Sequence, residues 1–299
     1  MAKILKYFVP LLFPTLLFAQ DSGLYGVLDM GMQRGTLLHN YNKNTNNNDD
    51  WDNDDGFDTI THRYLGALHG KLGYQFQNGW RLGIEASFSG AGGYKNRDGD
   101  VLVVGMENLP YTFPPGVMRT DFSIGLQVGY PIFQKSTDEL YLYLTFGDES
   151  TALGFTPIFS TTSTTFFQLD LEGRNAIASK FSLGYRAGIF WSPTPEVYLA
   201  AFDRDHYIRF ENGDSDNAVR ADLKGGIWGL HGDIKLIYAA SKYFDVFAKY
   251  DFMARFVPKS ETVQTGVYDV LNNRSLGDVS LYTPKYFSFR SGIYLGIMF

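Results

Sequence analysis

The sequence predicts an all-β protein, a transmembrane antiparallel up-and-down β-barrel of about ten strands. Three observations predict this fold. Apolar and polar residues alternate with a period of two along many segments. The segments run over nine to thirteen residues, whereas soluble strands average about 5–6 residues and a tilted membrane strand needs about 9–11. The connections between the segments alternate between short turns and long loops, as in outer-membrane barrels.

The alternation is clearest in the last segment and recurs in segments 80–88, 181–191 and 244–256. One face of each segment is dense in Phe, Leu and Ile, so we expect it to contact lipid. In the last segment the apolar face holds Phe287, Phe289, Ile293, Leu295, Ile297 and Phe299, and the opposite face holds Ser288, Arg290, Gly292, Tyr294 and Gly296. Aromatic residues at segment ends, namely Trp80, Tyr130, Trp191 and Tyr238, suit an interfacial girdle.

The composition excludes several other classes of protein. The chain has 299 residues, no cysteine, 25 Phe, 20 Tyr and a net charge of -6. The absence of cysteine excludes a disulfide-stapled domain. An acidic balance without a basic stripe argues against a nucleic-acid partner. Repeated apolar runs of about 20 residues, which a helical membrane bundle needs, are missing.

Residues 1–20 read as a secretory signal peptide, and residues 21–299 as the barrel. Lys3 and Lys6 give a positive start, an apolar stretch follows from Phe8 to Phe18, and Ala19 offers a small residue for cleavage. Cleavage would remove both lysines and change the net charge from -6 to -8.

Ten strands are expected, although the pattern is also compatible with eight or twelve. Their ranges are 22–34, 61–77, 80–91, 119–132, 139–149, 176–192, 196–210, 221–239, 244–257 and 285–299. Four connections are short (77–79, 133–138, 193–195 and 240–243), and the other five, 35–60, 92–118, 150–175, 211–220 and 258–284, are mostly long. Asn78-Gly79 is a strong hairpin signal, and Pro193 and Pro195 break a strand.

The last ten residues resemble the recognition signal of bacterial outer-membrane barrels. The terminal Phe299 follows Tyr294, Leu295 and Ile297 on an alternating strand. The resemblance implies that the outer-membrane assembly machinery is a partner through this strand, with outer-membrane lipid around the barrel.

The faces opposite the apolar ones should line the lumen and carry mixed charges. They supply Asp29, Arg63, His69, Lys71, Arg81, Glu85, Asp121, Lys180, Arg186, Asp203, Asp205, Arg209, His231, Asp233, Lys235, Asp245, Lys249, Asp251, Arg255 and Arg290. Ten strands enclose little space, so we expect these side chains to pair across the lumen; a transport pathway is the less favoured alternative.

Two acidic groups suggest chemistry at the loop side. Asp98 and Asp100 lie in the second long loop, and Asp205 precedes His206 near the end of the seventh predicted strand. Together with ten strands, this layout resembles the omptin family of outer-membrane proteases. The resemblance implies that Asp98 and Asp100 form one catalytic pair and Asp205 and His206 the other, with water activated between them. His231, on the next predicted strand, is the alternative base.

The first long loop is rich in carboxylates. Asp50, Asp52 and Asp54 could bind Ca²⁺ through their oxygens, but a solvated surface loop is the preferred interpretation. We expect no other cofactor.

These observations predict an integral outer-membrane barrel of a diderm bacterium with its long acidic loops outside the cell. Its role would be that of a surface protein, structural or adhesin-like, or of a narrow passage for solutes. An omptin-like endopeptidase is the alternative. A soluble lipocalin-like carrier is disfavoured, because one whole face of each strand is apolar.

Overall fold

The computed structural model describes residues 23–40, 57–91, 105–107, 117–135, 138–155, 158–201, 208–213, 218–270, 272–283 and 285–299. These residues are organised as β-strands, turns and short connections. None of them belongs to a helix long and apolar enough to cross a membrane.

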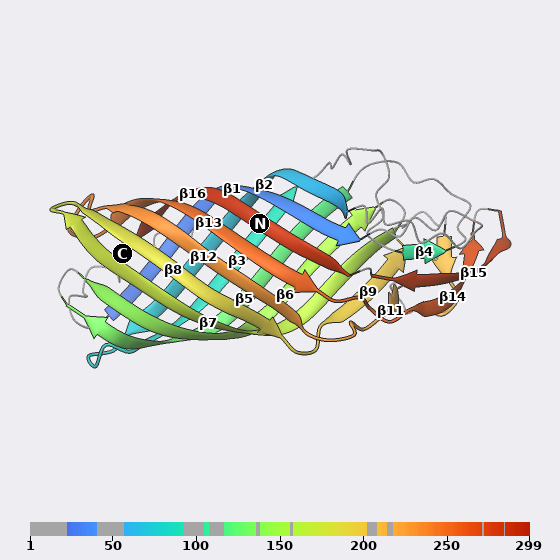
Figure 1. The fold of residues 1–299 in the computed structure, drawn as a ribbon, viewed down its shortest axis with the longest axis horizontal. Coiled ribbons are helices and arrows are strands. Elements are labelled where there is room, and N and C mark those ends of the chain that lie inside the picture. Colours follow the sequence, from blue (N-terminus) through green and yellow to red (C-terminus); the bar gives the residue numbers. More distant parts are fainter. Residues whose placement is uncertain are drawn as a thin grey trace, which may run out of the picture.

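Ten strands close an antiparallel barrel, which confirms the predicted fold and strand number. Their order around the barrel is β7-β6-β5-β3-β2-β1-β16-β13-β12-β8, and β8 pairs back with β7. Figure 1 shows these strands tilted against the long axis of the barrel. The barrel strands are β1 (Gly23–Asn40), β2 (Phe57–Gln75), β3 (Arg81–Ala91), β5 (Val117–Gln134), β6 (Glu139–Phe155), β7 (Ile158–Ala178), β8 (Phe181–Ser192), β12 (Ile227–Tyr238), β13 (Asp245–Val257) and β16 (Tyr286–Met298).

Short turns join strands at the end of the barrel where both β1 begins and β16 ends. The predicted turn at Asn78-Gly79 is confirmed: Gly79 has φ 85° and donates its N–H to the carbonyl of Phe76 over 2.9 Å. The side chain of Asn78 accepts a hydrogen bond from the backbone of Trp80. Glycine is favoured at such a position because a side chain would be strained at positive φ.

The structure corrects one strand assignment. Strand β7 occupies 158–178, where the sequence predicted most of a long loop, and a two-residue turn at 179–180 joins it to β8. Its lower half does alternate, because Phe167, Leu169 and Leu171 point outward. Its upper half is a run of Ser and Thr in which apolar and polar residues do not alternate. The sequence pattern therefore did not indicate a strand there.

A second correction follows from the first. The segment 193–195 lies at the long-loop end, since β8 now runs upward, so it is not one of the short turns. The predicted strand 196–210 is not a barrel strand: β9 (Glu196–Ala201) pairs with the upper part of β7, and β11 (Ala218–Arg220) pairs with β9. The prolines therefore do end a strand, but at the opposite end of the barrel.

The outer face of the barrel is apolar, and aromatic side chains form a row across it. Six of them stand directly opposite one another on six consecutive strands and are all exposed: Phe146, Phe167, Trp191, Trp228, Phe256 and Phe287. Trp80 and Tyr130 contact each other near the other end, as do Phe181 and Tyr238. The ten-residue rise between the two ends, tilted about 40°, spans about 25 Å.

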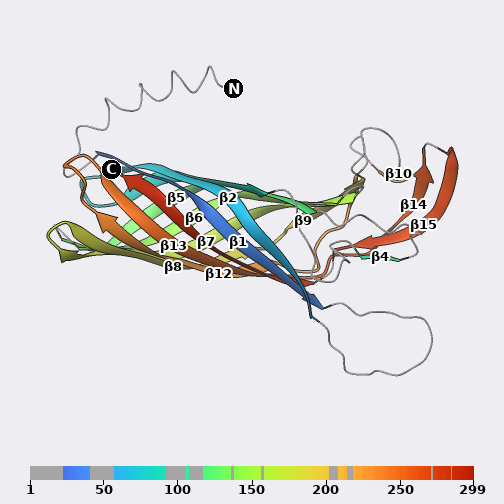
Figure 2. The same cartoon turned by 90° about the horizontal axis from the view of Figure 1, so that it is seen from above.

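A smaller sheet lies beyond the long-loop end of the barrel (Figures 1 and 2). Its order is β10-β14-β15-β4, where the sequence predicted mainly loops. The strands are β10 (Ile208–Phe210), β14 (Val263–Asp269), β15 (Arg274–Tyr282) and β4 (Gly105–Glu107). At the β14–β15 turn, hydrogen bonds from the side chain and backbone of Asn272 hold the pKa of Asp269 below its usual value.

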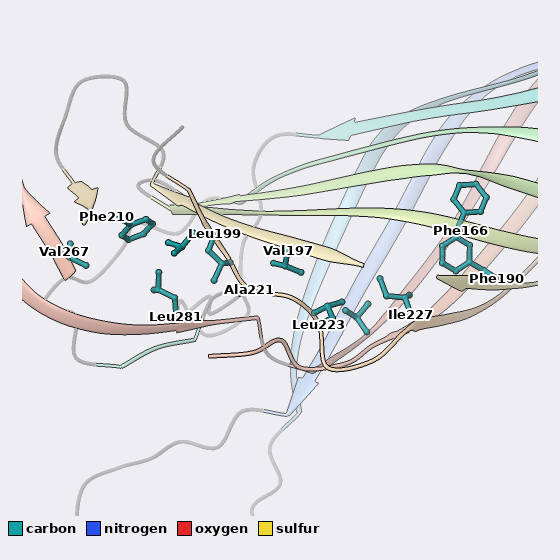
Figure 3. Close-up of a cluster of buried hydrophobic side chains, with 12 residues drawn as sticks. Phe166, Phe190, Val197, Leu199, Phe210, Ala221, Leu223, Ile227, Val267 and Leu281 are labelled. Atoms are coloured by element: carbon teal, nitrogen blue, oxygen red, sulfur yellow. The ribbon is translucent and has the colours of Figure 1, made fainter. Parts of the chain in front are cut away.

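A cluster of buried hydrophobic side chains joins this sheet to the barrel end (Figure 3). Phe166 and Phe190 stack at its barrel side, with ring centroids 5.2 Å apart. The other members are Val197, Leu199, Phe210, Val219, Ala221, Leu223, Ile227, Val257, Val267 and Leu281. Burial of each large side chain contributes roughly 1.5–3 kcal/mol, so the cluster is a small core at the long-loop end of the barrel.

Candidate functional site in the barrel lumen

The lumen is filled by charged side chains that pair across it, as the sequence predicted. A chain of contacts runs through its middle and joins strands that are distant around the barrel. His69 stands at its centre, with Nδ1 3.1 Å from a carboxylate oxygen of Asp29 and Nε2 3.1 Å from one of Glu85. Lys249 contacts the same Asp29 oxygen at 2.8 Å.

Arg186 continues this chain to the opposite wall. Its guanidinium reaches Glu85 on β3 at 3.1 Å and Asp170 on β7 at 2.8 Å. Asp170 in turn lies 2.8 Å from Nε2 of His231. The Asp170 side chain is fully buried, so Arg186 is the group that compensates two carboxylates inside the barrel.

A second group of charges lies nearer the short-turn end. Glu172 receives two ammonium groups, from Lys71 at 3.1 Å and from Lys235 at 3.4 Å. Lys235 also contacts Asp233 at 3.3 Å. Lys71 stands 3.9 Å above the ring centre of Tyr143, which adds a cation–π contact.

A third group lies towards the long-loop end. Asp121 binds Arg119 at 2.9 Å and Arg290 at 3.0 Å. Arg255 forms a bidentate pair with Glu149 and stands 4.0 Å from the ring centre of Phe190. Phe190 belongs to the hydrophobic cluster, so the charged groups of the lumen contact this apolar core directly.

Two cavities in the lumen are lined by residues that the structure describes. A vestibule of about 670 Å³ opens at the short-turn end, and an inner chamber of about 140 Å³ lies deeper. Only Val27, Lys71, Glu172 and Lys235 line both. The three charged members of this set are the ones that contact one another, so their ion pairs form the partition between vestibule and chamber.

The sequence identified most, but not all, of these residues. The expected residues that lie in the lumen include Asp29, His69, Lys71, Glu85, Arg186, His231, Asp233, Lys235 and Lys249. Lys180 and Arg209 do not: both are exposed, Lys180 in a turn and Arg209 on the outer sheet. Asp170 and Glu172 were missed because β7 was taken for a loop; their alternation with Leu169 and Leu171 is the signal that could have found them.

Most of the predicted catalytic and metal-binding residues lie outside the described residues. These are Asp98, Asp100, Asp205 and His206, and the loop carboxylates Asp50, Asp52 and Asp54. The alternative base His231 is described: its side chain is buried within the barrel, beside Asp170.

Comparisons with known proteins support the fold. No family model matches the chain, and no curated protein matches it. Among solved structures, the outer membrane protease OmpT from Escherichia coli superposes with a TM-score of 0.57 at 11% identity, covering 95% of this chain and 99% of that one. The translocator domain of the autotransporter NalP from Neisseria meningitidis gives 0.42 at 9% identity, covering 100% and 95%.

The chain therefore has the fold of an outer-membrane β-barrel. More narrowly, its closed ten-stranded layout resembles that of the omptin protease, at the level of fold. The identity is too low for the likeness to extend from fold to activity.

Proposed function

We propose that the chain is an integral barrel of the bacterial outer membrane that serves as a structural or adhesin-like surface protein with a filled lumen. The observation that carries this proposal is the ion-pair network: Arg186, Glu172 and Asp121 each bind partners from at least two other parts of the chain. Unpaired buried charges are costly, so a lumen built in this way favours packing over passage.

The outer surface supports membrane insertion. The outward positions of β12 hold Trp228, Leu230, Gly232, Ile234, Leu236 and Tyr238, without a charged residue. Most of these side chains are exposed, and so large an apolar surface is unfavourable in water. The aromatic rows at both ends fit the two interfaces of a bilayer.

The two ends of the chain fit export and assembly. Residues 1–20 would direct secretion, and the mature barrel would then meet the outer-membrane assembly machinery through its last strand. In the barrel, Phe299 and Gly26 exchange two backbone hydrogen bonds of 3.0 Å. The terminal residue thus belongs to the seam where the last strand pairs with the first.

Refolded protein is expected to migrate faster in gel electrophoresis without boiling than after boiling, and to remain silent in planar bilayers. The first result follows from a closed barrel, and the second from the charged side chains that pair across the lumen. A wide porin measured under the same conditions is the positive control. Discrete conductance steps from this protein would replace the filled-lumen proposal with the narrow-passage alternative.

An omptin-like endopeptidase is the second candidate, favoured by the fold likeness to OmpT over nearly the whole of both chains. Water would then be activated at the long-loop side by Asp98, Asp100, Asp205 and His206, with His231 as the alternative base. Folded protein should cleave a peptide that contains basic residues.

If that activity exists, Asp98→Ala and Asp205→Ala are each expected to lower the cleavage rate by about 10²–10⁴-fold, because general acid–base catalysis contributes about that much. The matched control is Asp222→Ala, which removes an exposed carboxylate at the same end of the barrel. Absence of cleavage in the unmodified protein, or equal rates in all three variants, would remove the catalytic assignment.

A further inference from the structure

The vestibule at the short-turn end has the size of a ligand site. Its volume of about 670 Å³ lies within the range of about 300–1,000 Å³ typical of small-molecule pockets. The inner chamber is much smaller, about 140 Å³. The vestibule is therefore large enough to admit a small molecule without displacing the ion pairs that cross the lumen.

The floor of the vestibule is made by two buried cations that share one anion. The side chains of Lys71 and Lys235 are only 6% and 9% exposed, and both contact Glu172. Each ammonium group has three donors. Lys235 also contacts Asp233 in the chamber behind the floor, so the two lysines stand against two carboxylates. The contact with Glu172 uses one of the three donors of Lys71.

The other charges of the vestibule largely balance one another. Arg81 pairs with Glu139 at 2.7 Å, and Arg174 pairs with Asp245 at 2.8 Å. Lys242 adds a positive charge in an exposed turn at the mouth. The remaining donors of Lys71 thus lie at the buried floor, where desolvation strengthens a hydrogen bond to an anion.

Apolar side chains supply the remaining wall. Val27 lies at the floor, and Ile237, Phe244 and Met298 continue towards the mouth. A ligand that extends from the lysines to the mouth would meet apolar surface along this side.

We propose that the vestibule binds an organic anion with an apolar body, its anionic head at Lys71 and Lys235 and its body against Val27, Ile237 and Met298. This site goes beyond the surface role proposed above. It relies on that role only for the side of entry, since the short-turn end of an outer-membrane barrel faces the periplasm.

The probe is 4-phenylbutyrate, with 4-phenylbutan-1-ol as the uncharged analogue, titrated calorimetrically into protein in lipid nanodiscs after subtraction of empty nanodiscs. We expect saturable binding of the carboxylate about tenfold tighter than that of the alcohol, because a charged hydrogen bond contributes about that factor. Added salt should lower the binding affinity of the carboxylate but not that of the alcohol. Equal affinity for both compounds, or uptake that does not saturate, would overturn the proposal.

Three variants locate the site. Lys71→Met should abolish the preference for the carboxylate, while Glu172 keeps its contact with Lys235. Val27→Trp leaves every charge in place but narrows the floor, so it should lower the binding affinity for both compounds. Lys180→Met, at an exposed lysine of a nearby turn, should change neither.

Folding of each variant is checked by its migration without boiling, so loss of the barrel is distinguished from loss of the site. Unchanged binding in folded Lys71→Met would refute the assignment. A failure of the proposed function would show separately, as conductance or as migration that boiling does not alter.

Discussion

Arg186→Met is expected to lower the free energy of unfolding by about 3–5 kcal/mol, since removing one partner of a buried ion pair leaves uncompensated charge behind. The guanidinium binds Glu85 and Asp170 on opposite sides of the lumen, and the Asp170 side chain is fully buried. Without Arg186, Glu85 would keep His69 and Asp170 would keep His231, which compensate only in part. Reversible urea unfolding of the barrel in lipid vesicles measures the change.

Arg274→Met is the matched control for that experiment. Arg274 also pairs with an aspartate, Asp269, at 3.4 Å, but the Arg274 side chain is 61% exposed, and the buried Asp269 keeps two hydrogen bonds from Asn272. Exposed pairs contribute about 0–1 kcal/mol, so this variant should unfold almost as the unmodified protein does. Arg186→Lys should fall between the two, because one cation remains but it cannot bridge both carboxylates. If the two methionine variants were equally stable, the lumen network would not be what holds the barrel wall together.

Most of the barrel strands were predictable from the sequence because lipid imposes one rule on them. Strands such as 181–192 and 245–257 must be apolar on every second residue, and this repetition is visible without any knowledge of pairing. The same rule gave the lumen face, since its residues occupy the alternate positions. The alternation alone predicted that face for His69, Glu85, Arg186 and His231.

The rule fails where a strand leaves the membrane. The upper part of β7 reads Ser160 to Thr165. Its outward positions, which continue the face of Phe167 and Leu169, hold Thr161, Ser163 and Thr165 in place of apolar residues. Threonine suits a strand but gives no apolar contrast. The strand 158–178 was therefore missed, and 196–210 was counted in its place, which left the total correct and the course of the chain from 150 to 210 wrong.

The partners within the lumen could not be predicted for a different reason. Glu85 and Arg186 are 101 residues apart, as are Lys71 and Glu172. Which pairs meet depends on the stagger of the strands around the barrel and on which strands face each other across it. The alternation along a strand gives the face on which each residue lies. It gives neither the position of the residue along the barrel axis nor the direction in which its side chain extends across the lumen.

Ile234→Arg is expected to destabilise the barrel in lipid by about 2–4 kcal/mol, the cost of an arginine at the bilayer midplane. Ile234 is 60% exposed on the outer face of β12, between Trp228 near one interface and Tyr238 near the other. Ile234→Ala separates the lost apolar side chain from the added charge. Tyr243→Arg, in the exposed turn after β12, should cost only about 0–1 kcal/mol because arginine near the interface remains hydrated. Urea unfolding in vesicles measures all three, and a protein whose outer face met water would instead gain solubility from Ile234→Arg and lose little stability.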